Sequence, residues 1–337
     1  MSLRLLATLV VLVSHVAGIA GAQQQPAWRD PSPHRQQFLS VDDSVQLEVL
    51  DWGGTGRTIV LLAGLGNTAH VFDDFAPTLL QFGHVYGITR RGFGASGHPA
   101  DGYGADQLGR DVLHVLDQLS LARPVLIGHS LAGQELSYIA SNEPQRVSAV
   151  VYMDAGYNYA YWPEETPPTL LVPPPGFPPP PQPAPSDLAS YATYRTWAER
   201  VNGYIVPESE IRQIRAVADS GAIGDRRRPP DSVQQAIYKG WMRFTDIKAP
   251  ALFIFASPHD LGPWIKDVPE QTPVAAFRQA DAEDVAQQAR RVERGIPQAE
   301  VARLPNANHY VFITQREDVL RLIDGFFKRL ADKTDAR

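Results

Sequence analysis

The chain has 337 residues, a formal net charge of −6 at pH 7 and no cysteine, and 44% of its residues are hydrophobic. A chain of this length and apolar content buries a large core, as one large or two ordinary domains. The lack of cysteine excludes disulfides and thiolate metal sites. The basic residues are scattered, with Arg226-Arg227-Arg228 as the one run, so no nucleic-acid partner is expected.

The first 22 residues have the pattern of a secretory signal peptide. Arg4 gives a positive start, residues 5–13 are apolar, and Ala20-Gly21-Ala22 has the form of a cleavage site. The apolar part is too short to span a bilayer, and polar glutamines follow it. We therefore expect an exported protein, periplasmic or secreted, cleaved near Ala22 and without a stable membrane anchor. The alternative is an uncleaved amphipathic anchor.

Strands and helices alternate in the pattern up to residue 154. Short apolar runs bounded by turn residues predict strands, and apolar residues at helical spacing predict helices. A hairpin is expected at 38–41 and 45–50, strands at 58–63, 84–89, 124–127 and 147–153, and helices at 71–82, 105–119 and after residue 131. This alternation predicts an α/β fold, a mostly parallel, doubly wound sheet with helices on both faces.

The alternation stops after residue 154 and resumes near residue 247. Residues 163–185 hold 12 of the 29 prolines and are expected to be extended, because proline interrupts helices and central strands. Helices are predicted at 189–202, 208–218 and 232–243, and the sheet returns at 250–256 and 299–304, with helices at 280–293 and 316–330. The expected organisation is therefore a signal peptide (1–22), a core in two parts (23–154 and 247–337) and a proline-rich, partly helical insertion (155–246). The aromatic run at 157–162 either lines a substrate pocket or packs the insertion onto the core.

The stretch 124–133 combines a strand, a serine and a helix start. A serine at a sharp strand-to-helix corner exposes its hydroxyl above the sheet, and the amide end of the helix points at the same place. The turn needs small residues two positions before and after the serine, and Gly128 and Ala132 supply them around Ser130. This geometry suits a nucleophile. His129, inside the motif, is expected to be a packing or hydrogen-bonding neighbour.

This stretch resembles the α/β-hydrolase family, in which Gly-His-Ser-x-Gly is common, with Ala132 at the second small position. The segment Ala63-Gly64-Leu65-Gly66-Asn67 is similar to the family's His-Gly-x loop, although Ala63 replaces the histidine. The resemblance implies an oxyanion hole formed by the amides of Leu65 and Leu131. Residues 90–97 look like the family's Arg-Gly-x-Gly-x-Ser segment, which we interpret as a structural loop, and the insertion lies where the family carries its cap.

A serine hydroxyl needs a base to accept its proton, and histidine suits this role because its pKa lies near 7. A carboxylate must orient that histidine. The family's chain order of serine, acid and histidine is met by Ser130, Asp260 and His309, each of which follows a predicted strand. Asp154, at the end of the preceding strand, is the rival for the acid, because some family members use that position.

These residues predict an exported serine hydrolase that cleaves carboxylic esters through an acyl-enzyme, with a small acyl substrate and no metal or organic cofactor. The same triad also suits amide or C–C bond hydrolysis or acyl transfer. A non-catalytic ligand-binding protein of the same fold is the alternative of another class. A serine at position 130 argues against the family's dehalogenases and epoxide hydrolases, which need a carboxylate there. The sequence does not fix the acyl length or the oligomeric state.

Overall fold

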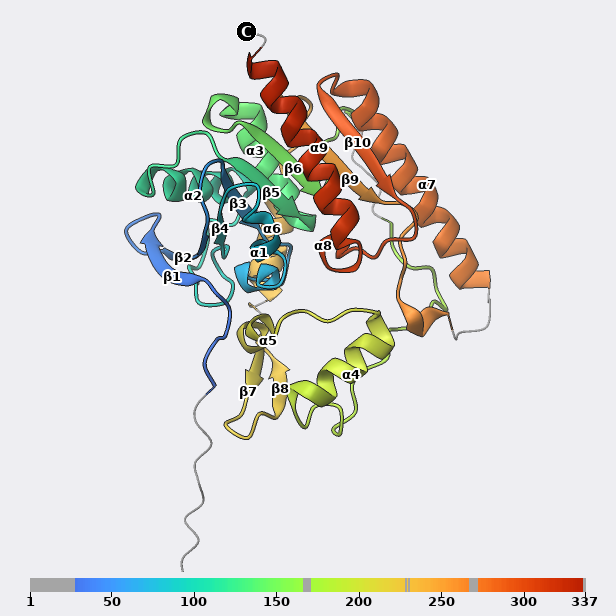
Figure 1. Cartoon of the computed structure of the whole chain (residues 1–337). Helices are drawn as coiled ribbons and strands as arrows, with labels where there is room; N and C mark the ends of the chain where they lie inside the picture. Colours follow the sequence, from blue (N-terminus) through green and yellow to red (C-terminus); the bar gives the residue numbers. More distant parts are fainter. Residues whose placement is uncertain (1–27, 166–170, 228, 230, 267–271, 336–337) are drawn as a thin grey trace, which may run out of the picture. The chain divides into compact units, whose positions relative to one another are not determined.

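The computed structural model describes residues 28–165, 171–227, 229, 231–266 and 272–335, so the expected signal peptide lies outside the described residues. Residues Pro31–Arg337 form one compact unit, which is the subject of this description. Its described part contains an eight-stranded sheet in the order β1-β2-β4-β3-β5-β6-β9-β10 (Figure 1). The strands are β1 (Arg35–Ser40), β2 (Gln46–Gly53), β3 (Thr58–Leu62), β4 (His84–Ile88), β5 (Val125–His129), β6 (Ala149–Met153), β9 (Ala251–Ala256) and β10 (Ala299–Leu304).

The sheet is mostly parallel, as the sequence predicted. β2 pairs antiparallel with β1 and with β4, and the pairs from β4 through β3, β5, β6 and β9 to β10 are all parallel. Every residue of β5 and β6 is buried. Central parallel strands are covered on both faces, which explains why these segments are continuous apolar runs rather than alternating ones.

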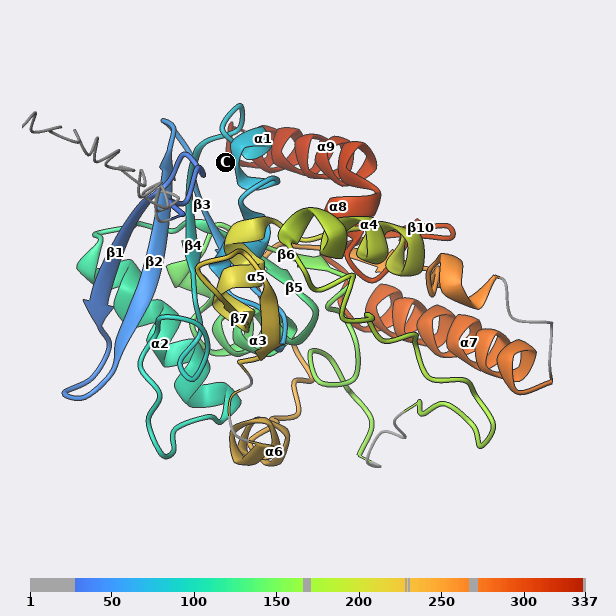
Figure 2. The same ribbon diagram turned by 90° about the horizontal axis from the view of Figure 1, so that it is seen from below.

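Helices cover both faces of the sheet (Figure 2). Alternate residues of each strand face opposite sides, so Leu61 lies in one hydrophobic core and Leu62 in the other. The first core is closed by α1 (Ala76–Leu79), α8 (Val311–Thr314) and α9 (Arg316–Asp335). The second is closed by α2 (Ala105–Gln118), α3 (Gly133–Asn142) and α7 (Thr272–Gly295). No helix in the described ranges is both long and apolar enough to cross a bilayer.

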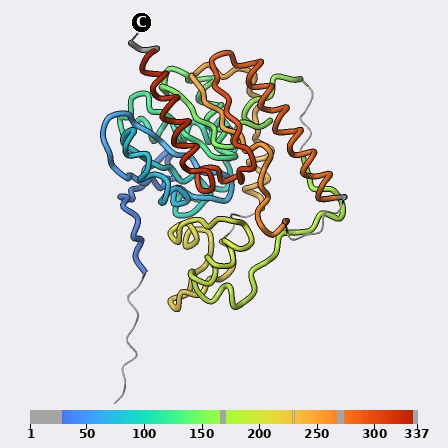
Figure 3. Tube along the Cα trace, turned by 45° about the vertical axis from the view of Figure 1, so that its right-hand side comes forward, coloured from blue at the N-terminus to red at the C-terminus, as the bar shows by residue number. Residues whose placement is uncertain are grey.

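The segment between β6 and β9, residues 155–246, is called the cap segment below (Figure 3, green to yellow). It contains α4 (Tyr191–Asn202), α5 (Glu208–Ile214), α6 (Asp231–Lys239) and a two-stranded hairpin of β7 (Arg215–Val217) and β8 (Ile223–Arg226). The helix expected at 208–218 is wrong in its second half, where β7 begins. The described part of the proline-rich stretch has neither helix nor strand.

The expected helix at 71–82 is also wrong. The chain instead forms a short 3-10 helix, η1 (Ala69–Phe72), and then the single turn α1. Thr68 caps η1 by accepting a hydrogen bond from the His70 amide, and Pro77 in the first turn of α1 has no amide hydrogen to continue a preceding helix. Three further 3-10 turns are η2 (Ser130–Ala132), η3 (Pro144–Arg146) and η4 (Pro263–Ile265).

Candidate active site

Ser130 lies at the corner between β5 and α3, as the sequence predicted. Its φ of 52° is in the left-handed region, which is uncommon for a residue with a side chain and marks a tight, strained turn. A Cβ added to Gly128 would lie 2.9 Å from the Cβ of Ala132, and one added to Gly64 would lie 3.0 Å from the Cβ of Ser130. A side chain at position 128 would collide with Ala132 of the turn, and one at position 64 would be tightly packed against Ser130.

Three side chains form a continuous chain of hydrogen bonds at the carboxyl ends of β5, β6 and β10. Nε2 of His309 lies 2.9 Å from Oγ of Ser130, and Nδ1 of His309 lies 2.6 Å from Oδ2 of Asp154. The ends of parallel strands share one edge of a sheet, which brings together residues up to 179 positions apart. This is the arrangement of serine, base and orienting carboxylate that acyl transfer requires.

Asp260 does not take the place that the sequence analysis gave it. Its carboxylate accepts hydrogen bonds from the Gly262 amide at 3.0 Å and from Lys266 Nζ at 3.2 Å, and Asp154 occupies the position on His309. The reason is the direction of the chain after β9. His259 pairs with Ala307 in a parallel bridge, and successive side chains of extended backbone face opposite sides. His259 therefore faces Asp154, and Asp260 faces away.

Asp154 is fully buried and accepts four hydrogen bonds. Oδ1 accepts from the Tyr157 hydroxyl at 2.6 Å and the Ala256 amide at 2.9 Å, and Oδ2 accepts from His309 and from Nε2 of His259 at 2.8 Å. Burial by itself raises the pKa of this carboxyl, but the charge and hydrogen bonds of His259, together with those of His309, hold the pKa well below its usual range. Asp154 is therefore ionised at neutral pH.

His259 joins Asp154 to Asp281. Its Nε2 contacts Asp154, and its Nδ1 lies 2.9 and 3.0 Å from the two carboxylate oxygens of Asp281. Burial lowers the pKa of His259, but the two carboxylates outweigh burial and raise the pKa to about 10. His259 is therefore a cation at neutral pH, and it donates from both ring nitrogens. The carboxylate that meets His309 is thus also held from the other side by a fixed positive charge.

His129 is the hydrogen-bonding neighbour that the sequence predicted. Its side chain is buried, and its Nε2 lies 3.0 Å from the main-chain carbonyl of His309. Burial, reinforced by the charge of His309, lowers the pKa of His129 to about 3, so the ring is neutral and donates from Nε2. This bond joins the serine strand directly to the loop that carries the base.

Arg90 fixes the loop that follows β3. Its guanidinium donates to the carbonyls of Ala63 at 2.8 Å and Gly64 at 3.3 Å, and its Nε donates to Glu135 of α3 at 2.5 Å. Both Arg90 and Glu135 are buried. Arg90 therefore fixes the main chain directly before Leu65. The interpretation of this arginine segment as a structural loop is confirmed, and the oxyanion roles of Leu65 and Leu131 stay a prediction.

The cap segment reaches this loop through a buried carboxylate. Glu210 of α5 accepts hydrogen bonds from Nδ2 of Asn67 at 2.8 Å, from the amide of Thr68 at 3.2 Å and from the Thr68 hydroxyl. Oδ1 of Asn67 in turn accepts from the hydroxyl of Tyr310 at 2.9 Å, next to the base His309. Burial raises the pKa of Glu210 to about 7, against the opposing effect of these hydrogen bonds. One cap residue is thereby linked to both loops of the site.

The aromatic run after β6 packs on the core, as one of the two expectations had it, and also contacts the triad; its place in a substrate pocket stays a prediction. Tyr157 donates a hydrogen bond to Asp154, and the Tyr159 hydroxyl interacts with the Ser130 side chain. Tyr161 and Trp162 are buried in packing.

A pocket of about 140 Å³ adjoins the loop after β3 and the cap segment. It is lined by Leu65, Gly66, Asn67, Tyr194, Ala198, Asn202, Tyr204, Ile205, Val206, Ile211, Ile214, Arg226 and Tyr310.

The sequence analysis missed the roles of His259, Asp281, Arg90 and Glu210. His259 stands directly before Asp260, so a strand-end position was visible, but the side chain that faces inward depends on the pairing with Ala307. Glu210 lies 142 positions from Thr68 and carries no local pattern. Asp154, His259 and His309 also form a group with metal-ligand geometry, although each is already engaged in the hydrogen bonds above.

A parallel sheet with a strained serine corner and a histidine after its last strand defines a class of hydrolytic enzymes. The model of the Alpha/beta hydrolase family matches residues 59–322, and the chain belongs to that family. This confirms the resemblance and the fold class, and it supports a hydrolase.

Curated relatives match shorter stretches. A putative non-heme haloperoxidase of Mycobacterium phage D29 is 33% identical over 103 residues, which are 30% of this chain and 37% of that protein. A putative carbamate hydrolase RutD of Variovorax paradoxus is 35% identical over 102 residues, which are 30% and 38% of the two chains. The chain therefore spans well under half the length of these relatives. An sn-1-specific diacylglycerol lipase ABHD11 of Danio rerio is 30% identical over 50% of this chain and 51% of its own.

Solved structures share the fold at low identity. E-2-(acetamidomethylene)succinate hydrolase superposes with a TM-score of 0.60 at 18% identity and covers 88% of this chain and 99% of its own. Carboxylesterase CesB of Bacillus subtilis superposes with a TM-score of 0.54 at 15% identity and covers 88% and 92%. At these identities the likeness concerns the fold alone.

Proposed function

We propose that the protein is a serine hydrolase that cleaves carboxylic esters by two-step acyl transfer. The observation that carries the proposal is the continuous hydrogen-bonded chain from Ser130 Oγ through His309 to Asp154, at 2.9 and 2.6 Å. A serine, a base within hydrogen-bond reach and an oriented base are the three parts of an activated nucleophile. Hydrolase relatives and the family membership support the class of reaction.

In the first step, Ser130 Oγ attacks the ester carbonyl carbon while Nε2 of His309 accepts the hydroxyl proton. The imidazolium that forms is stabilised by ionised Asp154. The amides of Leu65 and Leu131 hold the negative oxygen of the tetrahedral intermediate, each donor being worth about 3 kcal/mol of barrier. His309 then returns the proton to the leaving alcohol as the C–O bond breaks. Water, deprotonated by His309, releases the acid from Ser130.

The substrate we propose is an ester with a short acyl group. The pocket beside Leu65 holds about 140 Å³ and is lined mostly by apolar and aromatic side chains. A pocket this small next to the oxyanion loop accommodates a short acyl chain and rejects a long one. We further propose that the enzyme is exported after cleavage near Ala22, on the basis of the leader pattern in the sequence.

The test is a screen of p-nitrophenyl esters of rising acyl length, combined with labelling by a fluorophosphonate. We expect turnover that is highest for short acyl groups, one label per chain on Ser130, and loss of both in Ser130→Ala. Absence of labelling in well-folded protein would instead indicate a ligand-binding protein, and turnover of amides above esters would indicate a different bond. The N-terminal sequence of protein recovered outside the cytoplasm tests the export step.

A further inference from the structure

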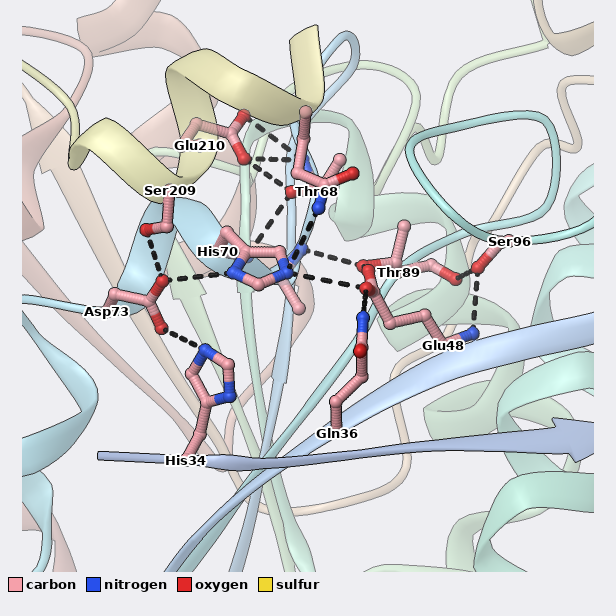
Figure 4. A network of polar contacts seen from close by, with 12 residues as sticks. His34, Gln36, Glu48, Thr68, His70, Asp73, Thr89, Ser96, Ser209 and Glu210 are labelled. Atoms are coloured by element: carbon pink, nitrogen blue, oxygen red, sulfur yellow. Dashed lines mark hydrogen bonds and ion pairs between the residues drawn. The ribbon is translucent and has the colours of Figure 1, made fainter. Parts of the chain in front are cut away.

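A second cluster of ligand-type side chains lies away from Ser130, next to the start of β1 (Figure 4). It consists of His34, just before β1, His70 of η1, and Asp73, which follows η1. The exposed fractions of their side chains are 6%, 3% and 2%. One ligand atom from each, two imidazole nitrogens and a carboxylate oxygen, lie within 4.8 Å of one another. None of these three side chains takes part in the proposed reaction at Ser130.

The spacing of the cluster is that of ligands around one small cation. In tetrahedral zinc sites with metal–ligand distances of about 2.0–2.1 Å, neighbouring ligand atoms lie roughly 3.3 Å apart, and the centres of two coordinated imidazoles lie about 5 Å apart. Nε2 of His34 is 3.3 Å from Oδ1 of Asp73, Nδ1 of His70 is 3.1 Å from Oδ2, and the two ring centroids are 5.0 Å apart.

Two other histidine–carboxylate pairs in this protein are closer. His309 meets Asp154 at 2.6 Å, and His84 meets Asp51 at 2.7 Å, as expected for charge-assisted hydrogen bonds. Oδ1 of Asp73 is buried, and within the described part of the chain its contact is with Nε2 of His34, at the longer distance of 3.3 Å. A buried carboxylate oxygen with so long a contact is stabilised further when a cation binds it.

The surroundings have the second layer that metal ligands usually have. Nε2 of His70 lies 3.3 Å from Oε1 of Glu48, a buried carboxylate of β2, so the other ring nitrogen is turned toward Asp73. Ser209 of α5 donates to Oδ2 of Asp73 at 2.5 Å. A carboxylate that holds the far nitrogen of a ligating histidine fixes its tautomer and strengthens it as a ligand.

We propose that His34, His70 and Asp73 bind a zinc ion, with solvent as the fourth ligand. The ion joins the start of β1 to the segment that follows the oxyanion loop and, through Ser209, to the first turn of α5 in the cap segment. Its role is structural: it holds this segment to the cap segment, in addition to the hydrogen bonds that Glu210 accepts from Asn67 and Thr68. The proposal does not depend on the reaction at Ser130.

The experiment is metal binding by the full chain, purified without a polyhistidine tag and dialysed against EDTA. We expect one equivalent of Zn²⁺ by titration calorimetry and by elemental analysis, a tetrahedral visible spectrum with Co²⁺, and a higher melting temperature with Zn²⁺ than with EDTA. His34→Gln and Asp73→Asn should lower the affinity at least 100-fold, and Glu48→Gln by about 10–100-fold, as for other second-layer residues.

Two controls separate this site from the active site. His309→Gln removes a member of the other group with metal-ligand geometry, and His84→Gln removes a histidine–aspartate pair of β4; both should keep the full affinity. No tight equivalent in the wild-type chain would overturn the proposal, as would binding that His309→Gln abolishes and His34→Gln leaves intact. If His34→Gln or Asp73→Asn does not fold, the Co²⁺ spectrum of the wild-type chain and the zinc affinity of Glu48→Gln still test the proposal.

Discussion

Nδ1 of His309 lies 2.6 Å from Oδ2 of Asp154, a residue at the end of β6, and not from the acid at the end of β9. Asp154 has a positive φ of 47°, which turns the chain sharply after the strand. The carboxylate thereby meets the base at the strand edge. The orienting acid of this protein thus lies one strand earlier than the family pattern suggested.

Replacement of this acid should therefore be far more damaging than replacement of Asp260. In a serine–histidine–aspartate triad, changing the acid to asparagine lowers kcat by about 10⁴-fold, and we expect a similar loss for Asp154→Asn. Asp260→Asn should keep kcat within about threefold, because it removes only a partly exposed contact with Lys266. Steady-state kinetics on a p-nitrophenyl ester measure both. If Asp260→Asn lost more kcat than Asp154→Asn, Asp260 would be the acid that orients His309.

The ion pairs of His259 should make the free energy of unfolding fall as the pH becomes alkaline. Its pKa is about 10 in the folded protein and about 6.5 when unfolded. The folded state therefore holds this proton more tightly, so the stabilisation is complete below pH 6.5 and is lost as the pH rises through 10. We expect His259→Gln to be less stable than wild type by about 1–3 kcal/mol at pH 7 and the difference to shrink at pH 10. Urea unfolding at both pH values measures it.

The exposed His98, which contacts the Gly94 carbonyl, offers a control for that series. His98→Gln should follow the wild-type curve at both pH values. A difference between wild type and His259→Gln that is constant from pH 7 to pH 10 would contradict the assignment of a charged His259.

Glu210 should make the free energy of unfolding fall at lower pH values, between acidic and neutral pH. Its pKa is about 7 in the folded protein against an ordinary value of 4.5, so the folded state again binds the proton more tightly. Stability from this group is complete below pH 4.5 and falls as the pH rises through 7. Glu210→Gln removes the ionisable group and keeps its shape. We expect wild type to lose about 1–3 kcal/mol relative to this variant between pH 5 and pH 8, measured by denaturant unfolding.

Glu208, two residues earlier in α5, is a suitable control for that measurement. It pairs with Arg212 at the surface of the same helix, so Glu208→Gln should run parallel to wild type over this range. Parallel curves for wild type and Glu210→Gln would mean that Glu210 does not take up a proton in this range.

Arg90 should affect turnover more than substrate binding. Lysine carries one point charge and no planar fork, so Arg90→Lys loses the simultaneous contacts with Glu135 and with the carbonyls of Ala63 and Gly64. We expect kcat to fall about 10–100-fold, as for small misplacements of a catalytic group, with a much smaller change in KM.

The neighbouring Arg91 provides the matched variant. It is equally buried and forms a bidentate pair with Asp111 of α2, away from the oxyanion loop. Arg91→Lys should lower the melting temperature, because it also removes the planar guanidinium from a buried ion pair. It should leave kcat within about twofold, because this ion pair does not contact the oxyanion loop. Equal losses of kcat in the two variants would show that Arg90 acts through general stability.

The sequence by itself determined the sheet and the serine corner, since both depend on local patterns. Continuous apolar runs such as 149–153 are required of strands covered on both faces, and the small residues around Ser130 are required by the turn. Local patterns failed where contacts between distant segments decide. The helix expected at 208–218 ends where β7 pairs with β8. The helix expected at 71–82 is interrupted before Pro77, which has no amide hydrogen to donate.

The choice of the acid was decided by tertiary structure alone. Asp154 and Asp260 both follow strands, and nothing in their neighbours indicates which one meets His309. The pairing of His259 with Ala307 turns one side chain inward and the next outward, and a single step along the chain reverses that choice. The same holds for Glu210 and Thr68, and for His34 and Asp73, because the packing of separate elements brings them together.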